Sequence, residues 1–325
     1  MTGLSVHIVH KPEGQALERL EADLPGQVVL TYGKGEAPPE TKVLVSGRPG
    51  RRLLDACPQL ETLIVPYAGI PPETLALLGE RGDLAVYNLH HNAASVAEAA
   101  IALLLAAAKA VVPMDSALRS YDWRPRFRPD PAIMLEGRHA LVLGYGAIGR
   151  RVARLCRGLG MSVSAVRRSG VVAQRDEVEV HGVQDLARLL PSAQVLMVCL
   201  PHTAQTEGLI SEEMLGLLPA GAVLVNIARA AIIDEEALFW SLSTGHLHSA
   251  GLDVWYRYPK GEKARTNTAP SAQPFEVLQN VVMSPHRSGH AGEIEVLRMV
   301  QLRRVIDALA AGEPAPNRVD CGRGY

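Results

Sequence analysis

The sequence predicts an α/β protein built from two doubly wound parallel-sheet domains. Short apolar runs rich in Val, Leu and Ile alternate with helical patterns along nearly all of the 325 residues, and this alternation is typical of parallel sheets covered by helices. At roughly 150 residues per domain, the length favours two domains. A glycine-rich turn, GYGAIG at 144–149, lies in the middle of the chain, before a second series of strands.

The composition narrows the class of protein. Hydrophobic residues make up 47% of the chain, which suffices for real cores and excludes intrinsic disorder. The 33 Lys and Arg residues are balanced by 34 Asp and Glu residues, so the chain lacks the basic excess that neutralises nucleic-acid phosphates. We therefore expect small molecules or other proteins as partners, and no nucleic acid.

Cysteine usage and hydropathy indicate where the protein works. The four cysteines are far apart and form no CxxC pair, which favours reduced thiols over disulfides or zinc, so we expect no metal. The first residues lack the pattern of a signal peptide, and the longest apolar run, 99–108, is about half of a membrane span. We expect a cytoplasmic protein with no membrane partner.

The first series of elements precedes the glycine-rich turn. The runs LSVHIVH, QVVLTY, KVLVS, ETLIVP and LAVYN predict strands, with helices at 16–20 and 72–78 between some of them. A strong Ala/Leu helix is predicted at about 93–110, where Ser95 and Glu98 have capping-box spacing. Its apolarity on all sides predicts that it is buried between two domains.

The second series follows a proline-containing crossover at 111–135, whose first half predicts a helix. The runs ALVLG, MSVSAV, VLMVCL, AVLVNI, SAGLDV and NVVMSP predict strands. Helices are predicted at 147–159 and at 293–311, the latter ending at AAGEPAP. The polar stretch 255–274 predicts a long loop, and long loops in compact domains are often functional.

The glycine-rich turn predicts a dinucleotide site. Gly144 permits a tight turn after a strand, Gly146 leaves room for a pyrophosphate, and Gly149 lets the following helix pack closely on the strand. The helix begins with Ala147 and Ile148, and its first N–H groups are free to bind phosphate.

The end of the next strand predicts which dinucleotide binds. An acidic residue about 20 positions beyond the motif would accept hydrogen bonds from the ribose hydroxyls of NAD. This sequence has Arg167, Arg168 and Ser169 instead, and guanidinium groups suit a 2′-phosphate. We expect NADP(H), with NAD possible; a solvated basic turn is the alternative.

Eight fragments in a fixed order cover most of the chain: VPYAGI, NAASVAE, LEGRHALVLGYGAIG, LPHTAQTEGLI, LPAGAVLVNIAR, AGLDV, NVVMSPH and NRVD. In this order they resemble the NAD(P)-dependent D-2-hydroxyacid dehydrogenases, in particular glyoxylate/hydroxypyruvate reductases. The resemblance implies a Rossmann cofactor domain at 111–289, inserted in a flavodoxin-like substrate-binding domain formed by 1–110 and 290–325. It also implies a homodimer that reduces a small 2-oxo acid to the D-2-hydroxy acid, or catalyses the reverse reaction.

The resemblance also implies the site residues. Arg229 would hold the substrate carboxylate and polarise the carbonyl, since guanidinium groups bind carboxylates bidentately. His286 would be the acid–base group, because histidine titrates near neutrality. Backbone N–H groups of Tyr67, Ala68 and Gly69 would bind the substrate carboxylate, although these residues also suit an ordinary turn. The remaining cofactor contacts would be Pro201, Thr206, Ala228 and Asp253, the last at the nicotinamide carboxamide.

One departure from the family bears on the chemistry. Tyr258 stands five positions after Asp253, where the family usually has a glutamate paired with the histidine. A carboxylate raises the pKa of such a histidine, whereas a phenol only offers a hydrogen bond, so we expect His286 to be less readily protonated. Two alternatives stay open: an enzyme acting on another small oxyanion such as formate, and a cofactor-binding sensor or corepressor.

The other histidines and aromatic residues have plainer interpretations. His90 and His91 are expected in a surface loop. The pair at 246 and 248 resembles an HxH metal pair, but without a third ligand nearby we expect a structural role. Trp255 and Tyr256 could line a substrate pocket or could serve packing alone.

Overall fold

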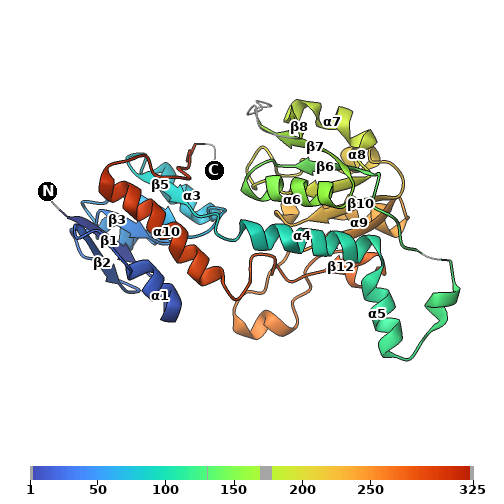
Figure 1. Cartoon of the computed structure of the whole chain (residues 1–325), viewed down its shortest axis with the longest axis horizontal. Coiled ribbons are helices and arrows are strands. Elements are labelled where there is room, and N and C mark those ends of the chain that lie inside the picture. Colours follow the sequence, from blue (N-terminus) through green and yellow to red (C-terminus); the bar gives the residue numbers. More distant parts are fainter. Residues whose placement is uncertain (1–2, 130, 169–177, 323–325) are drawn as a thin grey trace. The chain divides into compact units, whose positions relative to one another are not determined.

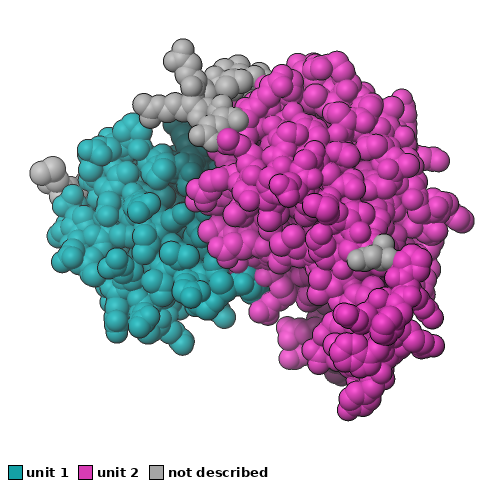
Figure 2. All heavy atoms as spheres, turned by 45° about the vertical axis from the view of Figure 1, so that its right-hand side comes forward, with its two compact units in different colours: residues 1–92, 290–325 teal, residues 93–289 magenta. Residues whose placement is uncertain are grey.

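The computed structural model describes residues 3–129, 131–168 and 178–322 (Figure 1). By their internal contacts, 1–92 and 290–325 form one compact unit and 93–289 form a second (Figure 2). The second unit begins with α4 (Ala93–Ala108), whereas the boundary predicted from the sequence, residue 110, lies just after the end of this helix. This helix groups with the second unit because it packs against α6 and against the strands β10, β11 and β12 of that unit.

The first unit contains a five-stranded, all-parallel sheet in the order β2-β1-β3-β4-β5. This is the flavodoxin-like order expected for this part of the chain. Its strands are β1 (Leu4–Ile8), β2 (Val28–Tyr32), β3 (Val43–Val45), β4 (Thr62–Val65) and β5 (Ala85–Asn88), and its helices are α1 (Gly14–Glu21), α2 (Arg51–Asp55), α3 (Pro72–Gly79) and α10 (Ile294–Ala311).

The second unit contains a seven-stranded, all-parallel sheet in the order β12-β11-β10-β9-β6-β7-β8. The strand order reverses at β6, which gives the sheet the doubly wound arrangement of a Rossmann domain. Its strands are β6 (His139–Leu143), β7 (Ser162–Arg167), β8 (Glu179–Gly182), β9 (Val195–Val198), β10 (Ala222–Asn226), β11 (Leu247–Leu252) and β12 (Val281–Met283). Besides α4, its α-helices are α5 (Val111–Arg119), α6 (Ala147–Gly158), α7 (Leu186–Leu189), α8 (Glu212–Gly216) and α9 (Glu235–Ser243).

Two cores cover the two faces of the larger sheet, because successive strand residues point to opposite faces. Along β6, Ala140 and Val142 belong to the core under α4 and α6. Leu141 and Leu143 belong to the other core, which also contains residues of α8 and α9. Both faces are buried, which explains why the strands read as continuous apolar runs rather than as alternating ones.

The fold class and the predicted strands are confirmed, and the differences concern short or locally ambiguous elements. Ser95 does not cap α4, since the helix begins at Ala93 and the Ser95 hydroxyl donates to the Ser288 carbonyl instead (2.8 Å). The edge strand β8 and the helices α2, α7, α8 and α9 were not predicted. One signal for α9 was present: the Asp234 carboxylate accepts a hydrogen bond from the Ala237 N–H (2.8 Å), as an N-cap does.

Candidate active site and dinucleotide-binding turn

The turn between β6 and α6 requires its glycines for different reasons. Gly144 has a φ of +104°, and an added Cβ would lie 2.7 Å from the carbonyl carbon of Cys199. A Cβ on Gly149 would lie 1.8 Å from the Gly144 carbonyl oxygen, so no larger residue fits there. At Gly146, no described atom beyond its chain neighbours lies within 4 Å of an added Cβ. The turn is therefore closely packed at its ends and open at the position where a pyrophosphate approaches.

Three strand ends meet at this turn. The Gly144 N–H donates to the Val166 carbonyl at the end of β7 (2.9 Å), and the Cys199 N–H, just after β9, donates to the Leu143 carbonyl (2.8 Å). Arg167 is the last residue of β7, and Arg168 follows it with an exposed side chain. Both arginines thus lie at the carboxyl edge of the strand beside the turn, where a dinucleotide ribose binds in such folds. Ser169 lies outside the described residues.

The loop after β9 is shaped by one threonine. The Thr206 hydroxyl accepts a hydrogen bond from the Thr203 N–H (2.8 Å) and donates to the Pro201 carbonyl (2.8 Å). The side chain of Thr206 therefore closes its own loop. Pro201 and the backbone of Thr206 lie beyond the carboxyl end of β9, and β9 is the strand beside β6 in the sheet.

Arg229 follows β10, where a buried asparagine holds the backbone. Asn226 accepts a hydrogen bond from the Ala228 N–H (3.0 Å) and donates to the Arg229 carbonyl (3.1 Å). The Arg229 guanidinium donates to the Ala228 carbonyl (2.6 Å), and its side chain is exposed. Sequence reasoning missed Asn226, although a polar residue ending the apolar run AVLVN was a usable signal.

His286 and Tyr258 meet through a hydrogen bond. The Tyr258 hydroxyl lies 2.9 Å from His286 Nδ1, and it accepts a hydrogen bond from the Trp255 N–H (3.2 Å). Partial burial raises the pKa of Tyr258, while the Trp255 N–H and the charge of Arg229 act in the opposite direction. The phenol is therefore neutral near pH 7. The structure thus brings Arg229, Tyr258 and His286 together within one unit.

Asp253 directly follows β11 and contacts the segment that carries His286. Its side chain is 1% exposed, and its carboxylate accepts hydrogen bonds from residues on both sides of His286. Trp255 and Tyr256 follow it and serve packing: both lie against the core of the second unit, and Tyr256 donates to the Ile233 carbonyl (2.9 Å).

The segment Tyr67–Gly69 belongs to the first unit and leaves its donors available. Its carbonyls are held, because the Asn88 amide donates to the Ala68 oxygen (2.8 Å) and the Leu89 N–H donates to the Tyr67 oxygen (3.3 Å). Within the described part of the chain, the N–H groups of Tyr67, Ala68 and Gly69 donate to no other residue. A turn with fixed carbonyls and available N–H groups suits an anionic group.

Two expectations about histidines are tested by their surroundings. His91 is not in an exposed loop: it is 6% exposed, and its Nε2 accepts a hydrogen bond from Arg298 (3.2 Å). Burial is the main cause that lowers its pKa to about 4, and the Arg298 charge adds to this. His246 bonds to the Leu215 carbonyl through Nε2 (3.1 Å).

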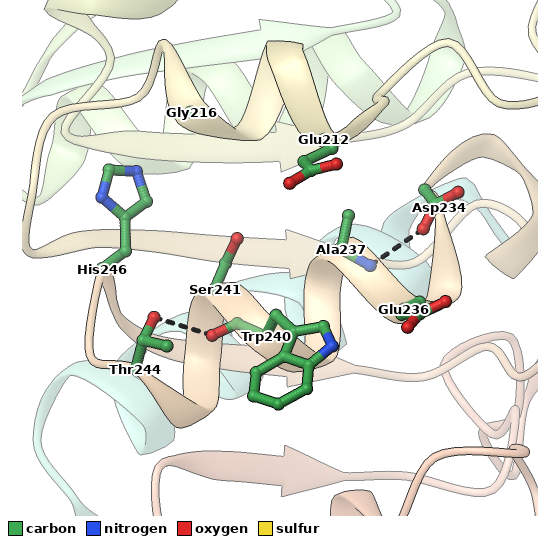
Figure 3. Close-up of a pocket in the computed structure, with 9 residues that line it drawn as sticks. All are labelled: Glu212, Gly216, Asp234, Glu236, Ala237, Trp240, Ser241, Thr244 and His246. Atoms are coloured by element: carbon green, nitrogen blue, oxygen red, sulfur yellow. Dashed lines mark hydrogen bonds between the residues drawn. The ribbon is translucent and has the colours of Figure 1, made fainter.

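A surface hollow lies between α8 and α9 (Figure 3). One side of the hollow is lined by Trp240 of α9 and by Thr244, the C-cap of that helix, and Glu212 of α8 faces them. None of the residues predicted for the site lines this hollow, so it is separate from the predicted chemistry.

The described ranges contain neither a metal-binding cluster nor a single helix that could span a membrane. No group of three or more His, Cys, Asp or Glu residues there could hold a metal ion. No single helix there is long and apolar enough to cross a bilayer; α4 and α5 pass that test only as a pair, bent by 68°.

Comparison with known proteins places the chain. Residues 101–288 match the family described as D-isomer specific 2-hydroxyacid dehydrogenase, NAD binding domain. The chain is 33% identical over 245 residues to D-3-phosphoglycerate dehydrogenase of Archaeoglobus fulgidus, covering 74% of this chain and 44% of that protein. It thus spans less than half the length of this relative. It is 28% identical over 309 residues to glyoxylate reductase of Korarchaeum cryptofilum, covering 90% of this chain and 89% of that protein.

A solved structure of a D-isomer specific 2-hydroxyacid dehydrogenase is similar to this chain over its whole length. The D-isomer specific 2-hydroxyacid dehydrogenase from Xanthobacter autotrophicus Py2, in complex with NADPH and MES, matches with a TM-score of 0.81, 26% identity and full coverage of both chains. Fold and matches together define an α/β protein with an NAD(P)-binding domain. The chain belongs to the D-isomer specific 2-hydroxyacid dehydrogenase family.

Proposed function

We propose that this dehydrogenase reduces a small 2-oxo acid, such as glyoxylate or hydroxypyruvate, to the D-2-hydroxy acid, or catalyses the reverse reaction, and prefers NADP(H). The observation that carries the proposal is the cluster of Arg229, Tyr258 and His286 in the unit with the dinucleotide turn. The similarity to a glyoxylate reductase over nine-tenths of the chain supports the substrate class.

The residues divide the chemistry among them. Bound NADPH supplies a hydride to C2 of the oxo acid. Arg229 binds the substrate carboxylate and draws electron density from the carbonyl. His286 gives a proton to the carbonyl oxygen as negative charge develops there. Tyr258 orients the imidazole through its hydrogen bond at Nδ1.

Cofactor preference is assigned to the end of β7. The guanidinium groups of Arg167 and Arg168 would pair with the 2′-phosphate, since arginine offers bidentate donors to phosphate oxygens. We expect NADPH to bind at least about tenfold more tightly than NADH, a gap of about 1.4 kcal/mol. Fluorescence titration of both cofactors measures this gap, and the double variant R167A/R168A should abolish it. Equal affinities in the parent protein would contradict the assignment.

The reaction itself is tested by a panel of 2-oxo acids assayed with NADPH and NADH, with chiral analysis of the product. Replacing His286→Gln should lower kcat by about 10² to 10⁴, which is the usual contribution of a general acid. His139→Gln is the matched control, because His139 is the first residue of β6 and therefore lies at the amino end of the strand, away from the glycine-rich turn at its carboxyl end. Cofactor binding by the parent without any turnover would favour the sensor alternative.

A homodimer is proposed from an exposed apolar arm. The arm consists of α5 and the 3₁₀ helix η1 (Arg124–Phe127), and α5 extends away from α4 in Figure 1. Tyr121, Trp123 and Phe127 are 90%, 61% and 79% exposed. Such an apolar patch is typical of a protein interface. We propose that a second copy of this chain covers it.

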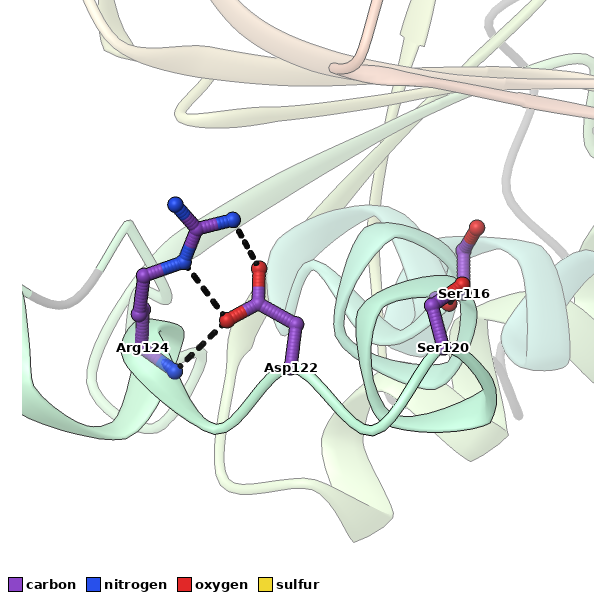
Figure 4. A network of polar contacts seen from close by, with 4 residues as sticks. All are labelled: Ser116, Ser120, Asp122 and Arg124. Carbon is purple, nitrogen blue, oxygen red and sulfur yellow. Dashed lines mark hydrogen bonds and ion pairs between the residues drawn. The ribbon is translucent and has the colours of Figure 1, made fainter.

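Polar contacts hold the arm in shape. Arg124 donates from its side chain and its backbone N–H to the Asp122 carboxylate at 2.7–3.0 Å (Figure 4). These bonds lower the pKa of Asp122 to about 2, so the carboxylate is ionised at neutral pH.

The cytoplasmic location expected from the sequence stays a prediction, which cell fractionation would check.

A further inference from the structure

The carboxylate of Asp253 holds the segment that carries His286. Oδ1 accepts hydrogen bonds from the Ser284 hydroxyl (2.5 Å) and from the Arg287 N–H (2.8 Å), and Oδ2 accepts one from the Ser288 N–H (3.0 Å). These donors lie on both sides of His286. A carboxylate has about four acceptor sites, so most of the capacity of Asp253 is used by this one segment.

The backbone of this segment needs such support. His286 has a φ of +58°, in the left-handed region that residues with side chains rarely adopt. The chain bends at His286, and the N–H groups of Arg287 and Ser288 both donate to the Asp253 carboxylate. A left-handed residue other than glycine persists where surrounding contacts hold it.

Two further side chains hold the carbonyls of the same segment. The Trp255 indole N–H donates to the Ser284 carbonyl (2.8 Å), and the Ser95 hydroxyl of α4 donates to the Ser288 carbonyl (2.8 Å). The segment is therefore fixed at both ends, and Asp253 is the only one of these partners that bears a charge. The backbone of Trp255 also donates to Tyr258, the partner of His286.

We propose that Asp253 is a positioning residue, which sets the direction of the His286 imidazole by folding residues 284–288 around its carboxylate. The contact with the nicotinamide carboxamide expected from the family resemblance stays a separate prediction. The inference rests on the proposed role of His286 as the general acid. Its consequence is that removal of the Asp253 charge affects the chemical step more than cofactor binding.

The main test is Asp253→Asn, which keeps the size of the side chain but places an amide where one oxygen now accepts a hydrogen bond. We expect kcat at saturating NADPH to fall by about 10²-fold, as displacements of about 1 Å do. The Kd of NADPH, the KM of the oxo acid and the melting temperature should stay near the parental values. A Kd raised tenfold or more with an unchanged kcat would overturn the inference in favour of the carboxamide contact.

A milder variant guards against misfolding. Ser284→Ala removes one of the three donors, and we expect kcat to fall at least about threefold with the Kd of NADPH unchanged. Its matched control is Ser249→Ala, because Ser249 is 2% exposed on the same strand as Leu252 and its hydroxyl has no partner among the described residues. If Ser284→Ala matches this control in kcat, the inference fails.

His286→Gln, assayed in parallel, distinguishes a failure of the proposed function from a failure of the positioning role of Asp253. If that variant keeps the parental kcat, the proposed function fails and takes the inference with it. If it loses activity while Asp253→Asn keeps it, only the positioning role is overturned.

Discussion

At the scale of single residues, the partner of His286 decides which form of the imidazole is favoured. The Tyr258 hydroxyl accepts from the Trp255 N–H, so its own proton can point at His286 Nδ1. A donor at Nδ1 favours the neutral imidazole, whereas reduction of an oxo acid needs a protonated one. We therefore expect the rate of reduction to decline at a lower pH with tyrosine at position 258 than it would with glutamate there.

Replacing Tyr258→Glu should therefore extend reduction to higher pH. A carboxylate beside the imidazole stabilises its charged form and should raise the apparent pKa of the reductive rate by about 1 unit or more. The profile of kcat against pH, measured between pH 5 and pH 9, checks this. Tyr256→Phe is a control, since that hydroxyl bonds to a carbonyl away from His286. An unchanged profile would mean that another group partners the histidine.

His91 makes a second residue-scale prediction, concerning stability. Its pKa is lowered to about 4 in the folded protein, against an ordinary value of 6.5. Since the unfolded chain binds the proton first, stability present above pH 6.5 is lost as the pH falls toward 4. Between pH 7 and pH 5 the parent should lose about 2 kcal/mol more than His91→Gln. Urea unfolding at both pH values measures the difference, and parallel losses would refute it.

At the scale of elements, the contact between β6 and α6 depends on one missing side chain. Gly149→Ala would place a Cβ 1.8 Å from the Gly144 oxygen, and overpacking of this kind costs about 1–3 kcal/mol. Gly158→Ala, in the same helix with open space around its Cβ position, should be neutral or stabilise by up to about 1 kcal/mol. Urea midpoints of the two variants check this, and equal effects would contradict the packing argument.

Gly146 serves as an independent test of the same turn. No described atom beyond its neighbours obstructs a Cβ there, so Gly146→Ala should fold with parental stability. It should still weaken NADPH binding, since the pyrophosphate needs the space that a methyl group would fill. NADPH affinity that is unchanged in this variant would place the phosphates elsewhere.

How far elements could be predicted from sequence depended on their length and periodicity. The apolar strands of both sheets and the long helices α4, α6 and α10 were predicted within a few residues. The short helices α2, α7 and α8 lack enough turns to show a period. The edge strand β8 is short, and with Glu179 and His181 it is not a continuous apolar run. The assignment of α4 to the second unit depends on contacts with strands more than a hundred residues away.

At the scale of the whole molecule, the apolar arm predicts assembly. If a second copy covers it, sedimentation velocity of the parent should show a dimer, and the double variant W123E/F127E should sediment as a monomer. Trp240→Glu is the matched control, since Trp240 is also exposed but lies on α9 in the hollow of Figure 3. A dimer that survives the double variant would place the interface elsewhere.

The amino-acid sequence was enough to predict the α/β class and the glycine-rich turn, because periodicity and glycine spacing are local properties that each segment carries alone. The family was predicted from the resemblance of eight ordered fragments. The resemblance implied that Tyr258 pairs with His286, and the structure shows that hydrogen bond. That the Asp253 carboxylate is enclosed by residues 284–288 was visible in the tertiary structure alone. The tertiary structure also decided that His91 is buried against Arg298. These outcomes depend on which distant segments become neighbours, and that information lies in the packing of the sheets rather than in any single stretch of chain.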